Sequence, residues 1–209
     1  MQSPEAPGLA PDAATFRNNM TVTFNVLHAA IRQGITRIVI VSSETVLGLP
    51  FDTPPPYVPV DEKYAARPES IYSLGKHLEE TMAIELVRWH PELTITALRF
   101  SNVMDVEDYA AFDADARARK WNLWSYIDGR DGALAVDLAL GRSGPGFERF
   151  IIASPDTVTT RPNAELLAEV FPDVEVRGEI GEHTTLLSID KARQLLGYDP
   201  QHSWRDEVQ

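Results

Sequence analysis

The spacing of hydrophobic positions divides the chain into helix-like and strand-like segments. Residues 15–33 and 70–89 carry apolar side chains three to four positions apart, which predicts two amphipathic helices. Between them, residues 37–43 read RIVIVSS, a β-branched run typical of a strand buried on both faces of a parallel sheet. On the first helix, the side chains expected to face the core are Phe16, Met20, Phe24, Leu27 and Ile31.

The same alternation continues toward the C-terminus. Residues 93–100 (LTITALRF) and 150–153 predict two further strands, and residues 132–140 predict a helix between them. The last part of the chain predicts a helix, a strand, a second helix and an irregular end, at residues 163–171, 174–177, 191–196 and 197–209. Because strands and helices alternate, the fold class is α/β, with layers of helix packed on a sheet.

Composition and charge narrow the classes of partner and site. The 209 residues carry a formal charge of −12, which argues against nucleic acid or an anionic membrane as the main partner. No cysteine occurs, so disulfides, thiolate metal sites and cysteine nucleophiles are excluded. The five histidines are scattered and no H-E-x-x-H motif occurs, so we expect no metal site. The N-terminus lacks the features of a secretory signal, so a cytoplasmic location is the expectation.

Candidate chemistry begins with Tyr72 and Lys76 at the start of the second predicted helix. Positions i and i+4 lie on one helix face, so the phenol and the ammonium can be neighbours. A tyrosine ordinarily titrates near pH ~10, and a nearby cation lowers its pKa toward working pH. The pair can therefore give and take a proton. Taken alone, the motif is weak, because many helices contain it by chance with a solvated tyrosine and lysine on the helix surface.

The surroundings of this motif favour the catalytic interpretation. The segments that follow the two strands read SSETVLG at residues 42–48 and LRFSNV at residues 98–103. In open α/β sheets, ligands bind beyond the carboxyl ends of the strands. With NMTVTFNVL at residues 19–27 and YIDGRD at residues 126–131, the chain resembles the extended short-chain dehydrogenase/reductase family. That family includes the nucleotide-sugar epimerases and dehydratases.

The resemblance implies a role for each matching residue. Ser43 would hydrogen-bond the substrate oxygen, Tyr72 would give or take its proton, and Lys76 would hold the nicotinamide ribose and tune Tyr72. Asn102 would lie near the substrate. The residues assigned to the cofactor are Asn19, Ser42, Lys76, Phe100 and Ser101. A purely structural role stays open for two of these residues. Asn19 would cap its helix or form a bridging hydrogen bond within it, and Asn102 would only form a turn of the backbone.

Two positions depart from the family pattern. Leu47 stands where the family commonly has tyrosine, and Glu44 follows the proposed catalytic serine. In the sugar dehydratases of the family this neighbourhood carries acidic residues that supply additional acid/base chemistry. Glu44 is therefore either a fourth catalytic residue or a solvated carboxylate at the rim of the site.

The resemblance implies NAD or NADP as cofactor, but the sequence lacks one part of that site. None of the 12 glycines forms a G-x-G-x-x-G turn, and the one glycine cluster, residues 141–146, reads as a loop. We therefore expect the chain to begin after the family's fourth strand, which weakens the case for cofactor binding by this chain alone. The RIVIVSS strand would then form an open sheet edge.

The expected architecture is a partial Rossmann-like parallel sheet with flanking helices, plus a small C-terminal α/β substrate lobe. Residues 1–103 and 128–154 would form the first unit. The lobe would comprise residues 104–127 and 155–209.

The predicted function is that of an NAD(P)-dependent oxidoreductase or epimerase, with hydride transfer coupled to proton transfer by Tyr72. Two alternatives stay open: cofactor-independent isomerisation or dehydration, and a non-catalytic dimeric binding subunit. The expected partners are a small hydroxylated or nucleotide-linked substrate and a second copy of the chain. The second copy would pack against the helices at residues 15–33 and 70–89.

Overall fold

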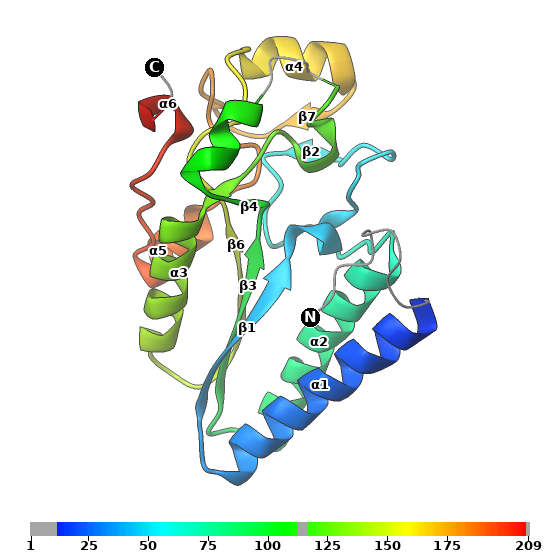
Figure 1. Ribbon diagram of the computed structural model, residues 1–209, viewed down its shortest axis with the longest axis vertical. Coiled ribbons are helices and arrows are strands. Elements are labelled where there is room, and N and C mark those ends of the chain that lie inside the picture. The colour runs from blue at the N-terminus through cyan, green and yellow to red at the C-terminus, as the bar shows by residue number, and fades with distance from the viewer. Residues whose placement is uncertain (1–11, 113–116, 208–209) are drawn as a thin grey trace.

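The computed structural model describes residues 12–112 and 117–207. Its centre is a three-stranded parallel sheet in the order β1–β3–β6 (Figure 1). The strands are β1 (Arg37–Ser43), β3 (Thr94–Phe100) and β6 (Gly146–Ile152). Val41 pairs with Leu98, and Leu98 with Phe150, so the carboxyl ends of all three strands lie at one edge of the sheet.

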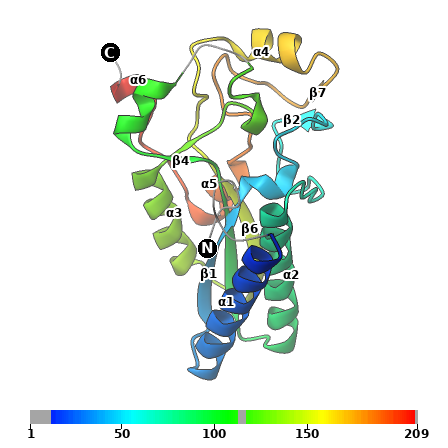
Figure 2. The same cartoon turned by 45° about the vertical axis from the view of Figure 1, so that its right-hand side comes forward.

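Helices cover both faces of this sheet. α1 (Asp12–Arg32) and α2 (Ile71–Trp89) pack on one face, while α3 (Gly129–Gly141) and α5 (Asp190–Leu196) pack on the other (Figures 1 and 2). This arrangement confirms the α/β class. α2 begins directly after Ser70, whose side chain accepts a hydrogen bond from the backbone N–H of Ser73. This N-terminal cap fixes the first turn of α2, which carries Tyr72.

Shorter elements lie beyond the carboxyl ends of the strands. β2 (Tyr57–Val58) pairs with β7 (Glu175–Val176), and β4 (Val103–Met104) pairs with β5 (Ile127–Asp128), both in parallel. The remaining elements are the 3₁₀ turns η1 (Glu44–Leu47), η2 (Val106–Ala111) and η3 (Lys120–Asn122) and the helices α4 (Asn163–Val170) and α6 (Trp204–Glu207). The C-terminal end is thus not wholly irregular, since α6 forms there. The division into two units stays a prediction.

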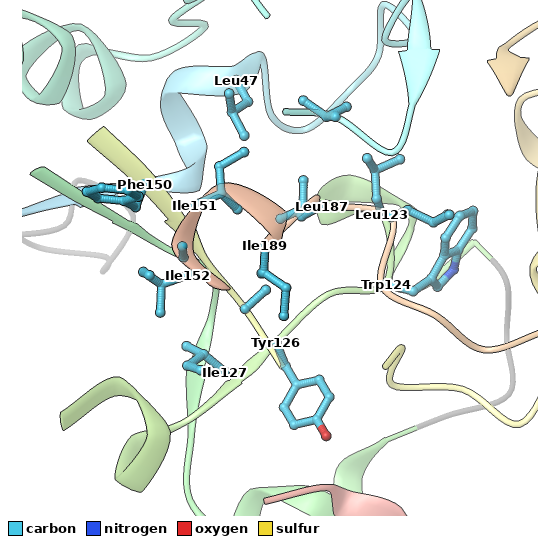
Figure 3. Close-up of a cluster of buried hydrophobic side chains, with 14 of the residues drawn as sticks. Leu47, Leu123, Trp124, Tyr126, Ile127, Phe150, Ile151, Ile152, Leu187 and Ile189 are labelled. Atoms are coloured by element: carbon cyan, nitrogen blue, oxygen red, sulfur yellow. The ribbon is translucent and has the colours of Figure 1, made fainter. Parts of the chain in front are cut away.

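The largest hydrophobic cluster joins the sheet to these shorter elements. It combines residues of β6, such as Ile151, with Trp124 and Leu187 from the connecting segments, and all three are fully buried (Figure 3). Leu47, which departs from the family pattern, is also fully buried in this cluster. A smaller cluster lies between α1, α2 and the sheet, and consists of Leu27, Ala83, Leu86, Leu93 and Ile95.

Two burial predictions were wrong. β1 is not buried on both faces: it is an edge of the described sheet, and Val41 is 45% exposed. This agrees with the expected open edge. In α1 the fully buried positions are Thr15, Asn19, Thr23 and Leu27, a mostly polar stripe, whereas Phe24 is 46% exposed. Leu27 is buried as expected, and Phe16, Met20 and Ile31 are partly buried, so packing against α2 turns the buried stripe only slightly from the one that apolar spacing indicated. None of the described helices has the length and hydrophobicity needed to cross a membrane.

Candidate active site

A pocket of about 370 Å³ opens at the carboxyl ends of β1 and β3. Its wall comes from four segments: the end of β1 with η1, the first turn of α2, the residues that follow β3, and η3. It is lined by Val41, Ser42, Ser43, Glu44, Thr45, Ser70, Tyr72, Phe100, Ser101, Asn102, Val103 and Trp121. Seven of the predicted site residues are thus brought to one cavity.

Ser43 and Tyr72 both line this pocket, and the Ser43 hydroxyl lies close enough to the phenol to lower its pKa. Ser43 also caps η1: its Oγ accepts the backbone N–H of Thr45 at 3.2 Å and the hydroxyl of Thr45 at 3.0 Å. η1 then ends at Gly48, whose φ of 97° favours glycine. The SSxxVxG pattern is therefore explained by a tight turn that holds the serine hydroxyl beside the phenol.

Lys76 lies one helical turn after Tyr72, and its Nζ is 5.8 Å from the centre of the Tyr72 ring. The side chain is buried, so the interpretation of a solvated lysine is wrong. Its Nζ donates to the carbonyl of Val41 at 2.7 Å and to Oε2 of Glu79 at 3.2 Å. Burial lowers the pKa of Lys76, and the carboxylates of Glu79 and Glu80 oppose that shift.

The pKa of Tyr72 itself lies above its ordinary value. Burial of the phenol is the largest cause, because it disfavours the charged phenolate. The hydrogen bond from Ser43 acts in the opposite direction, since it stabilises the phenolate. The charge of Glu79 adds to the upward shift. The phenol is therefore the resting form, and the site must supply a cation or a donor to make it a base.

Glu44 is buried, so the interpretation of a solvated rim carboxylate is wrong. Oε2 of Glu44 accepts from the hydroxyl of Ser101 at 2.7 Å, and Oε1 accepts from Nδ2 of Asn122 at 3.2 Å. Burial raises the pKa of Glu44 to about 8, although both hydrogen bonds and the charge of Arg119 oppose the shift. At neutral pH this group is therefore mostly a carboxylic acid rather than a carboxylate.

The residues assigned to the cofactor fall into two groups. Phe100 and Ser101 line the pocket, as does Asn102, whose carbonyl accepts the backbone N–H of Ile127 at 3.0 Å. Ser42 borders the pocket, but its hydroxyl donates to Oε1 of Glu80 at 2.7 Å. The role of each toward a cofactor or substrate stays a prediction.

Asn19 is apart from these residues. It lies within α1, on the buried stripe that faces α2, and is not among the residues that line the pocket. Its Oδ1 is buried without a hydrogen-bond partner among the described residues. A helix cap is excluded, because Asn19 is in the middle of α1. Its role in the cofactor site stays a prediction.

Three polar or aromatic neighbours of the site were missed or undervalued by the sequence analysis. Glu79 follows Lys76 by three residues, so helix spacing could have identified it. Asn122 lies 78 residues from the Glu44 carboxyl that it binds, and no local signal indicates the contact. Trp121 lines the pocket, whereas Trp124 is fully buried in the core.

The pocket contains part of the residue set that the resemblance assigns to a nicotinamide dinucleotide. Phe100 and Ser101 line the pocket beside Tyr72, whereas Lys76 lies behind it, buried one helical turn after Tyr72. For the pyrophosphate of the dinucleotide, the described residues offer no glycine-rich binding turn. The sequence contains no G-x-G-x-x-G motif, and β1 is the edge strand of the described sheet. Among the described residues, no group of three or more histidine, aspartate or glutamate side chains is arranged to hold a metal ion.

The fold is similar to that of several solved enzymes. A short-chain dehydrogenase/reductase superfamily protein from Agrobacterium tumefaciens with bound NAD is 22% identical, with a TM-score of 0.69, over 100% of this chain and 75% of that chain. UDP-N-acetylglucosamine 4-epimerase from Bacillus cereus is 20% identical, with a TM-score of 0.65, over 98% of this chain and 71% of that chain. dTDP-glucose 4,6-dehydratase from Bacillus anthracis in complex with NAD is 17% identical, with a TM-score of 0.64, over 97% of this chain and 68% of that chain.

Sequence comparison is more specific than these structural likenesses. No curated protein matches the chain. The profile of the NAD dependent epimerase/dehydratase family matches residues 8–118, which include Ser43, Tyr72, Lys76 and Asn102. That match covers more than half of the chain, and it contains the strand, turn and helix that build the pocket. The chain therefore belongs to the NAD dependent epimerase/dehydratase family.

Proposed function

We propose that this chain performs the proton-transfer chemistry of an NAD(P)-dependent epimerase or dehydratase on a nucleotide-linked sugar. The observation that carries the proposal is the placement of Ser43 and Tyr72 in one pocket, with buried Lys76 one helical turn away. A phenol, a hydroxyl and an ammonium at one end of a parallel sheet suit the removal of a proton from an alcohol.

The residues of the chain would act on the substrate hydroxyl. Ser43 would donate a hydrogen bond to the reacting oxygen, and the phenolate of Tyr72 would accept its proton. Lys76 would favour that phenolate through its positive charge. When bound, NAD or NADP would accept the hydride from the substrate carbon. Phe100 and Ser101 would border the nicotinamide ring, and Asn102 and Trp121 would border the sugar.

Dehydration is the second candidate reaction, and Glu44 favours it. A carboxyl group with a pKa of about 8 is mostly protonated at neutral pH and can donate a proton to a departing hydroxyl. Glu44 follows Ser43 directly in the sequence and contributes to the wall of the same pocket as Tyr72. The protonated carboxyl of Glu44 in the pocket wall is the feature that supports dehydration as the alternative to epimerisation.

We also propose a homodimer formed through α1 and α2. Outside the α1–α2 contact these helices expose the large apolar side chains Val22, Phe24, Val26 and Ile84. A second copy of the chain would cover this surface and leave the pocket open at the far end of the sheet.

The experiment is an assay of the purified chain with UDP-glucose, UDP-N-acetylglucosamine and dTDP-glucose, with and without added NAD or NADP. Product formation that requires the cofactor and is lost in Tyr72→Phe supports the proposal. Turnover without any nicotinamide supports cofactor-independent acid/base chemistry instead. If the chain binds these sugars but leaves them unchanged under all conditions, a non-catalytic binding subunit is the better account.

A further inference from the structure

A buried acid–base pair lies behind the pocket, on the side of α2 that faces α1. The Nζ of Lys76 and Oε2 of Glu79 are 3.2 Å apart, and the two side chains are 3% and 2% exposed. Thr23 of α1, itself buried, hydrogen-bonds the Glu79 carboxylate. The other oxygen, Oε1 of Glu79, has no hydrogen-bond partner among the described residues.

The pair is coupled to Tyr72 by helix geometry. Tyr72, Lys76 and Glu79 follow each other at spacings of four and three residues, so they lie along one face of α2. Lys76 is held from two sides, by the Val41 carbonyl at 2.7 Å and by Glu79. Its ammonium therefore has a fixed position relative to the phenol, and a counter-ion on its far side.

We propose that Glu79 is a positioning residue, which holds the Lys76 ammonium against the carbonyl of Val41 and offsets the positive charge that Tyr72 experiences. The inference rests on the proposed function of Tyr72 as the proton-transfer group. Within one stripe of α2, Lys76 favours the phenolate and Glu79 opposes it. Glu79 thereby sets the pH at which Tyr72 becomes a base, without touching the substrate.

Among residues 12–112 and 117–207, the second carboxylate of α2 near the pair is already committed to partners. Glu80, on the same helix, binds Arg99 of β3 at 2.7 Å and Arg149 of β6 at 3.5 Å. The buried stripe of α1 contributes only neutral side chains, including Thr23. In η1, Glu44 is mostly neutral at pH 7. Among the described residues, Glu79 is thus the carboxylate in direct contact with Lys76.

The test measures the pKa of Tyr72 in the whole protein, labelled with [ζ-¹³C]tyrosine and followed by NMR, with the resonance assigned by Tyr72→Phe. Glu79→Gln removes the charge and keeps the shape, so it should lower the pKa of Tyr72 by roughly one unit. Glu79→Asp keeps the charge and should leave the pKa closer to that of the wild type. Glu85→Gln, at an exposed position of the same helix, is the matched control and should change nothing.

An unchanged Tyr72 pKa in Glu79→Gln, or equal shifts in the Gln and Asp variants, would overturn the inference. If Glu79→Gln does not fold, ¹³C NMR of the Glu79 carboxyl in the wild type decides: a carboxylate at pH 7 is expected, and a neutral acid contradicts the proposal. None of these measurements needs a substrate, so they can succeed even if the proposed reaction fails. With a turnover assay in hand, the rise of kcat/KM with pH should move to lower pH in Glu79→Gln.

Discussion

Arg99 of β3 and Glu80 of α2 form a two-point ion pair in the interior of the protein. The Nε and Nη2 atoms of Arg99 donate to the two carboxylate oxygens of Glu80 at 2.8 and 2.7 Å, and both side chains are buried. Ser42 donates a third hydrogen bond to the same carboxylate, from the end of β1. With the Arg149 contact at 3.5 Å, one glutamate thus ties α2 to all three strands of the central sheet.

Replacing Glu80 with leucine should destabilise the protein by about 3–5 kcal/mol, because the Arg99 guanidinium would stay buried without a counter-charge. Chemical denaturation measures this free energy of unfolding. Glu85→Gln is the control, since Glu85 pairs with Arg88 at the exposed surface of the same helix and contributes about 0–1 kcal/mol. A loss below about 1 kcal/mol in Glu80→Leu would show that the pair does not tie α2 to the sheet.

The stability of the protein should depend on pH through Glu44. Burial raises its pKa to about 8, whereas in the unfolded chain it titrates near its ordinary value of 4.5. A raised pKa means that the folded state holds the proton more tightly, so its contribution is fully present below pH ~4.5 and is lost as pH rises through about 8. Glu44→Gln has no proton to lose and should escape this loss.

The measurement is the Tm of both proteins at several values between pH 5 and 9. The Tm of the wild type should fall relative to that of Glu44→Gln as the pH rises. The corresponding loss in free energy of unfolding is a few kcal/mol at most, since about 1.4 kcal/mol corresponds to one pKa unit. Parallel Tm curves for the two proteins would mean that Glu44 is ionised at neutral pH. The role of Glu44 as a proton donor would then be withdrawn.

The proposed dimer predicts a clear change in association. Placing charges on the apolar surface, as in Phe24→Asp combined with Val26→Asp, should convert a dimer to a monomer, because both side chains are exposed on α1. Light scattering coupled to size-exclusion chromatography reports the mass directly. Gln33→Asp, just beyond the end of α1, adds charge outside this surface and should leave the mass unchanged. A wild-type monomer at micromolar concentration would refute the dimer.

The parts of this fold that were predictable are those encoded locally. The spacing of apolar residues located α2 to within one residue. The YxxxK and SSxxVxG patterns predicted Tyr72 and Ser43, which line one pocket, and Lys76, which is buried one helical turn beyond Tyr72. Burial on α1 was not predictable in the same way, because it depends on which face α2 covers: Thr23 is buried and Phe24 exposed. The contact between Glu44 and Asn122 spans 78 residues and follows only from the tertiary fold.

The most direct test of the central claim is the steady-state kinetics of Tyr72→Phe with a sugar nucleotide and added NAD or NADP. The substitution removes only the phenolic oxygen of Tyr72, which lines the pocket together with Ser43. If Tyr72 transfers the proton, kcat should fall by roughly 10²–10⁴-fold while KM changes little. If Tyr72→Phe turns over at the wild-type rate, Tyr72 is not the proton-transfer group and the account given for this pocket is wrong.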